Sequence, residues 1–294
     1  MNALDPDGLP DPGPILRKII AAKHEEIQAL RAETPLDDMR QRAQDAPPPR
    51  DFRSAVAGPP GEIRLIAEVK KASPSKGLIR EDFDAVAIAR SYAAGGAAAI
   101  SVLTDARFFQ GSLEIFLAVR GAVDLPMLRK EFMIDPWQFY EARAAGADAV
   151  LLITSILTPA QLSGFHDLAR DLGMAVLVET HSEEDVRRAM SEIRPTLLGI
   201  NNRDLHDPSF KTDLEHTARM LPLVRELAGG DAAAPRIVSE SGIHTPRDVA
   251  RLRDLGVSAI LVGESLMRQP DPGKAARALL SGARGGGRGR KTKG

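Results

Sequence analysis

The amino-acid sequence predicts an α/β fold, namely a (β/α)8 TIM barrel with an extra N-terminal helix. Three observations support this prediction. Short apolar segments recur along the chain, helix-period stretches lie between them, and each apolar segment runs into polar or glycine residues. Successive apolar segments begin roughly 22 to 39 residues apart, which fits a strand, a helix and two loops.

The first predicted strand begins at Leu65, where four of five residues are apolar, and Ser-Pro-Ser-Lys-Gly breaks the extended pattern by Gly77. Such an apolar run is typical of a parallel strand buried on both faces. Seven later segments repeat the pattern: Ala98–Thr104, Leu125–Phe132, Ala149–Ile153, Ala175–Glu179, Leu197–Asn201, Arg236–Glu240 and Ala259–Gly263.

Helices are predicted between the strands, over Phe83–Ala94, Leu113–Ala122, Pro136–Ala145, Pro159–Leu172, Glu183–Glu192, Leu214–Leu227, Pro246–Leu255 and Pro272–Leu280. Several begin after a residue that can satisfy free backbone N–H groups: Asp135, Thr158, Ser182 and Thr245. Several end on glycine, which can adopt the left-handed conformation of a helix terminus. An open, doubly wound sheet is the alternative, but no GxGxxG motif follows the first strand.

Composition indicates one enzyme domain with no demand for a polyanionic partner. The 294 residues are 27% charged, with a formal net charge of −1. The absence of cysteine excludes disulfides, thiolate nucleophiles and zinc–thiolate sites. No apolar stretch is long enough to span a bilayer, and Asp5, Asp7 and Asp11 stand where a secretory signal would be basic. We therefore expect a cytoplasmic protein.

We expect three parts along the chain: a disordered tail over residues 1–14, a single (β/α)8 catalytic domain over 15–281, and a disordered basic tail over 282–294. The domain includes an amphipathic helix over Ile15–Ala32 and an extended connector at Ala46–Arg50. The last eleven residues, from Arg284, carry five positive charges. A solvated tail is the preferred interpretation, and a nucleic-acid contact is the alternative.

Charged and polar residues gather where the predicted strands end, which is where barrel enzymes carry their chemistry. They are Glu68, Lys70, Lys130, Glu131, Glu179, Asn201, Arg203, Glu240, Ser241, Gly263 and Glu264. Residues two apart on a strand face the same way, so we expect Glu68 with Lys70, and Asn201 with Arg203. Lysines beside glutamates suit acid and base work, because their pKa can be moved towards neutrality. A purely structural salt-bridge network is the competing interpretation.

Two glycine-bearing turns predict a phosphate site. Gly242 follows the seventh strand and Gly263 ends the eighth, and backbone N–H groups at such turns bind anions. Ser73 and Lys70 are placed to close the same site from the first loop. The alternative is that these glycines only permit tight turns.

No metal site is predicted, because the six histidines show no HxH or HExxH spacing. Only His181 lies near a strand end, and we interpret it as a surface residue. We likewise expect no cofactor, since no nucleotide-binding loop is evident.

The ordered set of motifs resembles the indole-3-glycerol phosphate synthase family from about Ile15 to about Leu280. The motifs are AEVKKASPSKG from Ala67, LTD from Leu103 with FFQGS from Phe108, LRKEF from Leu128, VETH from Val178, GINNRDL from Gly199, SESGI from Ser239 and LVGESLM from Leu261. The resemblance implies a carboxy-lyase of tryptophan biosynthesis. Its substrate is 1-(2-carboxyphenylamino)-1-deoxyribulose 5-phosphate, and its products are indole-3-glycerol phosphate, CO2 and water.

The resemblance also implies a role for each matching residue. Lys130 is the general acid for ring closure, while Glu179 and Lys70 transfer protons as water leaves and Glu68 orients the lysine and the leaving hydroxyl. Residue identity leaves open which lysine donates its proton in which step. Asn201 and Arg203 hold the carboxylate of the substrate. The remaining contacts fall to three groups: Phe108, Phe109 and Phe132 on the aniline ring; Glu240 and Ser241 near the hydroxyls and the phosphate; and Ser73, Lys70, Gly242, Gly263 and backbone donors at Glu264 on the phosphate oxygens.

Two loops depart from the family pattern: the run from His206 to Phe210 is about two residues longer, and Gly229–Pro235 is extended. Phosphoribosylanthranilate isomerase and the tryptophan synthase α subunit share a phosphate site but lack the Glu68, Lys70 and Lys130 pattern. A ligand-binding pseudoenzyme would lack the acid/base set. We expect a monomer that binds a small phosphorylated molecule, with no nucleic-acid or membrane partner.

Overall fold

The computed structural model describes residues 13–203 and 211–283, and in this part of the chain it forms a closed parallel barrel. Its strands are β1 (Arg64–Val69), β4 (Ala99–Leu103), β5 (Met127–Lys130), β6 (Ala149–Ile153), β7 (Ala175–Thr180), β8 (Leu197–Asn201), β9 (Arg236–Glu240) and β10 (Ala259–Val262). Each strand pairs with its neighbour in chain order, and β1 closes the barrel on β10. The (β/α)8 prediction is confirmed.

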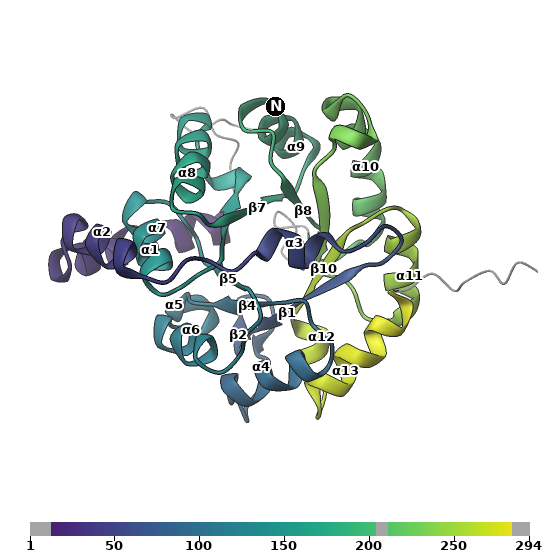
Figure 1. The fold of residues 1–294 in the computed structure, drawn as a ribbon, viewed down its shortest axis with the longest axis horizontal. Coiled ribbons are helices and arrows are strands. Elements are labelled where there is room, and N and C mark those ends of the chain that lie inside the picture. The colour runs from purple at the N-terminus through teal and green to yellow at the C-terminus, as the bar shows by residue number, and fades with distance from the viewer. Residues whose placement is uncertain (1–12, 204–210, 284–294) are drawn as a thin grey trace, which may run out of the picture.

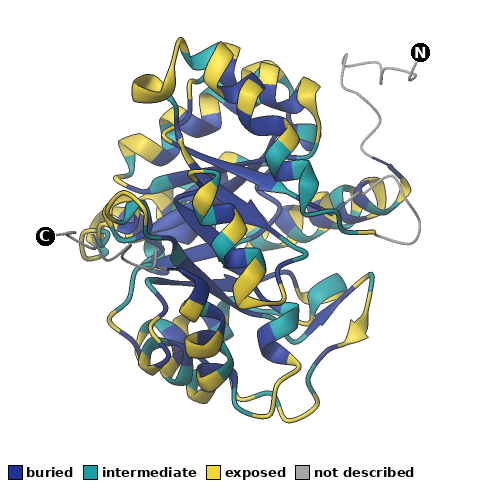
Figure 2. Ribbon diagram, turned by 90° about the vertical axis from the view of Figure 1, so that its right-hand side faces the viewer, coloured by how far each residue is buried: buried dark blue, intermediate teal, exposed yellow. Residues whose placement is uncertain are grey.

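The helices that follow the strands form the outer layer, and Figure 2 shows their exposed outer faces around a buried sheet. They are α4 (Ala85–Ala94), α6 (Leu113–Arg120), α7 (Pro136–Ala144), α8 (Pro159–Asp171), α9 (Glu183–Glu192), α10 (Glu215–Ala228), α11 (Pro246–Asp254) and α13 (Pro272–Leu279). The predicted N-caps are confirmed: Asp135, Thr158 and Thr245 form capping boxes, and the Ser182 hydroxyl accepts from the Asp185 N–H. These caps fix where each helix leaves the barrel rim.

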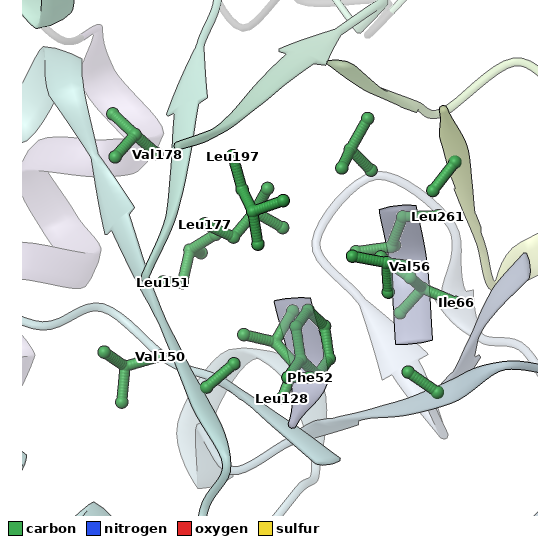
Figure 3. Close-up of a cluster of buried hydrophobic side chains, with 14 of the residues drawn as sticks. Phe52, Val56, Ile66, Leu128, Val150, Leu151, Leu177, Val178, Leu197 and Leu261 are labelled. Atoms are coloured by element: carbon green, nitrogen blue, oxygen red, sulfur yellow. The ribbon is translucent and has the colours of Figure 1, made fainter. Parts of the chain in front are cut away.

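The N-terminal extension contains three helices where the sequence predicted one: α1 (Pro14–Glu33), α2 (Leu36–Asp45) and α3 (Phe52–Ala57). Helix α2 packs on α7 with only Met39 and Ala43 buried, an apolar face too sparse to predict. Helix α3 lies across the barrel in Figure 1, just before β1. Figure 3 shows its Phe52 and Val56 among the side chains of the strands, so α3 closes the N-terminal end of the barrel.

Shorter elements complete the rim: the hairpin of β2 (Ala72–Ser73) and β3 (Gly77–Leu78), the helices α5 (Ala106–Phe109) and α12 (Glu264–Met267), and the 3₁₀ turns Thr154–Ile156, Asp231–Ala233 and Leu280–Gly282. The loop predicted as extended over Gly229–Pro235 holds one of these turns, whereas the lengthened run from His206 to Phe210 lies outside the described residues.

Packed residues extend slightly beyond the predicted domain limits at both ends. At the N-terminal end, helix α1 begins at Pro14. At the C-terminal end, Ala283 is buried, and its carbonyl accepts from the Ile63 N–H. Residues 282 and 283, which the prediction assigned to the C-terminal tail, thus pack with the barrel in the described part of the chain. The rest of both predicted tails lies outside the described residues.

Candidate active site

A pocket lies at the carboxyl ends of the barrel strands and brings together nearly all the predicted site residues. Its lining includes Glu68, Lys70, Ser73, Phe109, Lys130, Phe132, Glu179, Asn201, Arg203, Glu240, Ser241, Gly242, Gly263 and Glu264. Phe108 is the only predicted site residue that does not line this pocket. The short turn of α5 directs Phe109 into the pocket, whereas the Phe108 ring lies beneath the Arg107 guanidinium, 5.9 Å from it.

Lys130, at the end of β5, is the centre of the charge arrangement. Its ammonium donates to Glu179 Oε2 and lies 3.4 Å from Glu240 Oε2. All three side chains are at least 87% buried, because only 13%, 5% and 2% of their surfaces are exposed. One cation therefore lies between two carboxylates inside the barrel mouth.

The pKa values of the Glu179 and Glu240 carboxyl groups are shifted in opposite directions. Burial alone would raise the pKa of Glu179, but the Lys130 ammonium, with a smaller contribution from His181, holds it well below its usual range. Burial raises the pKa of Glu240 well above its usual range; Lys130 opposes this, and the Glu179 and Glu68 carboxylates add to it. The site therefore favours the ionised form of Glu179 and makes Glu240 the carboxylate that more readily takes up a proton.

The direction predicted for the Lys130 pKa was wrong. Burial alone would lower this pKa, but the carboxylates of Glu179, Glu240 and Glu68 together raise it above the ordinary value. The expected movement towards neutrality requires a lysine without compensating anions. Lys130 is thus a permanent ammonium at neutral pH, which is the protonation state of an acid.

The predicted pair on β1 is confirmed, with Lys70 Nζ 2.5 Å from Glu68 Oε1. The glycine at the end of β10 makes room for it. A Cβ on Gly263 would lie 2.4 Å from Glu68 Oε1, although the φ of −122° there is outside the left-handed region that favours glycine. Gly263 therefore gives the Glu68 carboxylate its place, a reason that the sequence did not show.

Asn201 and Arg203 face the pocket together as predicted, but their side chains already have protein partners. Asn201 Nδ2 donates to Glu179 Oε1 at 3.1 Å. Arg203 Nη1 donates to Ser75 Oγ at 3.3 Å, and its Nη2 lies 3.6 Å from Glu264 Oε2. Asn201 thus orients Glu179, while Arg203 connects the first loop to the end of β10.

The turn after β9 has the conformation that the anion-site prediction requires. Ser241 and Gly242 both have positive φ, 66° and 74°, so their backbone turns sharply at the pocket wall. Buried Asn202 fixes this turn, because its amide donates to the carbonyls of Glu240 and Ser241. The glycine is needed here, since Cβ would lie 3.1 Å from Thr212.

The apolar wall has a component that the sequence analysis missed. Phe109 and Phe132 lie with ring centroids 6.0 Å apart, and Ile15, Leu16 and Ile19 of α1 line the same pocket. The amphipathic period of α1 indicated an apolar face but not its partner. The extension is therefore part of the site.

A buried lysine holds α1 in place. Lys23, 1% exposed, lies 3.1 Å from Glu131 and 3.2 Å from Asp105. Asp105 in turn accepts from the backbone N–H groups of Phe108 and Phe109. Glu131 accordingly belongs to this structural network, next to Lys130 in the sequence.

His181, interpreted as a surface residue, is buried. Its side chain is 6% exposed, and Nε2 lies 3.0 Å from Glu179 Oε1. The error arose because a polar residue after a strand usually faces solvent, whereas this side chain turns inward onto the Glu179 carboxylate. Among the described residues there is no group of three or more acidic or histidine side chains placed to hold a metal, and no helix long and apolar enough to cross a membrane.

Comparisons with known proteins agree with this geometry. The sequence model of the family described as indole-3-glycerol phosphate synthase matches residues 16–279. The chain is 48% identical over 275 residues to the indole-3-glycerol phosphate synthase of Rippkaea orientalis, covering 94% of this chain and 92% of that protein. It is 51% identical over 274 residues to that of Roseiflexus castenholzii, covering 90% and 97%.

A solved structure, thiamine phosphate pyrophosphorylase from Pyrococcus furiosus, shares the fold with a TM-score of 0.55 and 17% identity, covering 75% of this chain and 95% of that one. At this identity the likeness concerns the barrel alone.

Proposed function

The chain belongs to the indole-3-glycerol phosphate synthase family and catalyses its decarboxylating ring closure in tryptophan biosynthesis, and we propose that the residues of the barrel mouth divide this chemistry as follows. The substrate is 1-(2-carboxyphenylamino)-1-deoxyribulose 5-phosphate. It carries a phosphate, a carboxylate, an aromatic ring and a ketone. A site for it needs two anion grips, an apolar wall and an acid.

Lys130 is the acid. As the ring carbon that bears the carboxylate bonds to the ketone carbon, the ketone oxygen takes a proton from the Lys130 ammonium and becomes a hydroxyl. The carboxylate then leaves as CO2, and its bonding electrons stay in the ring system. The observation that carries this assignment is the buried ammonium between Glu179 and Glu240, because their charges keep the lysine protonated.

Loss of water completes the double bond of the five-membered ring. The new hydroxyl leaves with a proton, and a second proton leaves the substrate skeleton. Ionised Glu179 is the base, and Lys70, held by Glu68, supplies the proton for the leaving hydroxyl. Asn201 keeps Glu179 aligned for this transfer.

Two groups of residues hold the two anionic groups of the substrate. Arg203 receives the carboxylate, and its loose 3.6 Å contact with Glu264 is the one that the substrate replaces. The backbone N–H groups at Gly242, Gly263 and Glu264, with Ser73 and Ser241, receive the phosphate. Phe109, Phe132 and the α1 side chains cover the aromatic ring.

Glycine substitutions test the phosphate assignment. Gly242→Asp places negative charge where we locate a dianion, so we expect KM for the substrate to rise about tenfold or more, the effect of losing a hydrogen bond to a charged group. Gly61→Asp is the matched control, because Gly61 has a similar φ of 79° and nothing within 4 Å of its Cβ position. Indole fluorescence reports turnover. An unchanged KM for Gly242→Asp would place the phosphate elsewhere.

We also propose that the protein acts as a cytoplasmic monomer that requires no cofactor and binds neither nucleic acid nor membranes. A net charge of −1 and membership in a family of biosynthetic enzymes support this. Light scattering during gel filtration gives the mass directly, and a value well above 31.6 kDa would contradict the monomer.

A further inference from the structure

Glu179 is held by three side chains, and only two of them belong to the pocket. Its Oε2 accepts from Lys130, and its Oε1 lies 3.1 Å from Asn201 Nδ2 and 3.0 Å from His181 Nε2. His181 does not line the pocket, so it reaches a substrate only through Glu179.

We propose that His181 is a positioning residue for the reaction, whose Nε2 fixes Oε1 of Glu179 so that the carboxylate faces Lys130 and Asn201. The inference rests on the proposed role of Glu179 as the base. Residues 179 and 181 are two apart at the end of β7, which puts both side chains on one face of the strand.

The surroundings hold the imidazole in one place. The His181 backbone N–H donates to Asp185 Oδ2 at 3.0 Å, and Asp185 is in turn paired with Arg188, which donates to the Thr154 carbonyl. The loop after β7 is thus tied to α9 and to the turn after β6. Both ring nitrogens of His181 are buried, and within the described part of the chain neither has a partner in hydrogen-bond geometry, but Nε2 lies 3.0 Å from Glu179 Oε1.

The short distance between Nε2 and the Glu179 carboxylate shows where the polar function of the ring lies. A buried polar side chain normally satisfies its ring nitrogens, so a ring kept for packing alone would be better replaced by an apolar one. Nε2 is the ring nitrogen that lies within ion-pair distance of another side chain, and that side chain is Glu179. His216 of α10 is the other titratable group nearby. Its pKa is lowered by burial, then by Arg219 and by His181.

Two amide substitutions separate positioning from packing. The Nε2 of glutamine can reach the place of the imidazole Nε2, whereas the shorter amide of asparagine reaches only the place of Nδ1. We expect His181→Gln to keep kcat within about threefold of wild type, and His181→Asn to lower it by roughly 10- to 100-fold, the effect of losing a hydrogen bond to a charged group. KM changes less than about threefold in both, because His181 does not contact the substrate.

His181→Leu and a second histidine provide the controls. The Leu variant fills the space without an N–H, so it behaves like the Asn variant if it folds. His166→Leu on α8 removes another buried histidine, paired only with Asp167 among the described side chains, and we expect wild-type kcat with a lower melting temperature. Equal kcat for the Gln and Asn variants, whether both are fast or both slow, would overturn the inference.

Glu179→Gln separates failure of this inference from failure of the proposed function. A Glu179→Gln variant with near-normal kcat contradicts the base itself. An inactive Glu179→Gln variant together with a fast His181→Asn variant contradicts only the positioning role. Circular dichroism and melting temperature establish that each variant is folded.

Discussion

Removal of the Lys130 ammonium has two consequences, one for turnover and one for stability. Lys130→Met keeps similar length and volume but removes the positioned proton donor. Removal of such a donor lowers a rate by roughly 10²- to 10⁴-fold. We expect kcat to fall at least about a hundredfold, with a much smaller change in KM, because the phosphate and carboxylate contacts stay.

The stability cost follows from the two carboxylates that Lys130 leaves behind. Glu179 and Glu240 are 95% and 98% buried at the side chain, and Lys130 is the cation they share. Removing one partner of a buried ion pair costs about 3–5 kcal/mol, so we expect a loss on the order of 3 kcal/mol at pH 8 after one carboxylate takes up a proton.

The loss depends on pH with a definite sign. In the wild type the depressed pKa of Glu179 contributes stability above about pH 4.3, the unfolded value, and this is lost as pH falls. In Lys130→Met burial raises the pKa of both carboxylates, so folding becomes less favourable as pH rises above about 4.3. The stability deficit of the variant is therefore large at pH 8 and smaller at pH 5.

Two measurements check this account: turnover by indole fluorescence, and urea unfolding at pH 5 and pH 8. Lys274→Met, at an 86% exposed lysine, is the matched control and should match wild type in both. A folded Lys130→Met variant that turns over at more than about a tenth of the wild-type rate contradicts the acid assignment. A deficit of equal size at both pH values contradicts the charge account.

Two further substitutions test neighbours of Lys130. Glu240 lowers the stability of the protein above about pH 4.3, because its pKa is raised in the folded state. Glu240→Gln should therefore lower kcat but increase the unfolding free energy by about 1 kcal/mol or more at pH 8, with a smaller gain at pH 5. A change in unfolding free energy that does not depend on pH would contradict the raised pKa. Gly263→Ala should lower kcat about tenfold or more, because the new methyl group displaces Glu68 from Lys70. Gly121→Ala is the control and should leave kcat unchanged, since no atom lies nearer than 3.7 Å to its Cβ position. Equal kcat for the two variants would contradict the proposal that Gly263 makes room for Glu68.

The sequence predicted the barrel because each strand and helix carries its own local signal. Apolar runs, N-cap residues and terminal glycines depend on neighbours a few positions away, so they can be recognised without knowledge of the packing. Helix α2 carries no such signal, because only Met39 and Ala43 bury against α7. Its position follows from tertiary contact with a helix about a hundred residues later in the chain.

Most residues that line the pocket could be predicted, because parallel strands bring their carboxyl ends to one mouth of the barrel. What could not be predicted is which polar atoms meet there. Phe108 and Phe109 are identical in type, and only the turn of α5 sends one into the pocket. His181 carries a polar side chain in a loop, and only the closure of the barrel buries it against Glu179.

The direction of the Lys130 pKa shift could not be predicted from the sequence either, and this direction bears on how Lys130 would act as the acid. Burial and charge act on Lys130 in opposite senses, so composition alone cannot give the sign of the shift. Glu179, Glu240 and Glu68 outweigh burial, which makes Lys130 a reluctant donor before substrate binds. A substrate that carries its own carboxylate and phosphate adds negative charge nearby, so it cannot ease proton release from Lys130 by electrostatics. The driving force must come from the basicity that the ketone oxygen gains as the ring carbon attacks, and proton transfer therefore accompanies bond formation rather than preceding it.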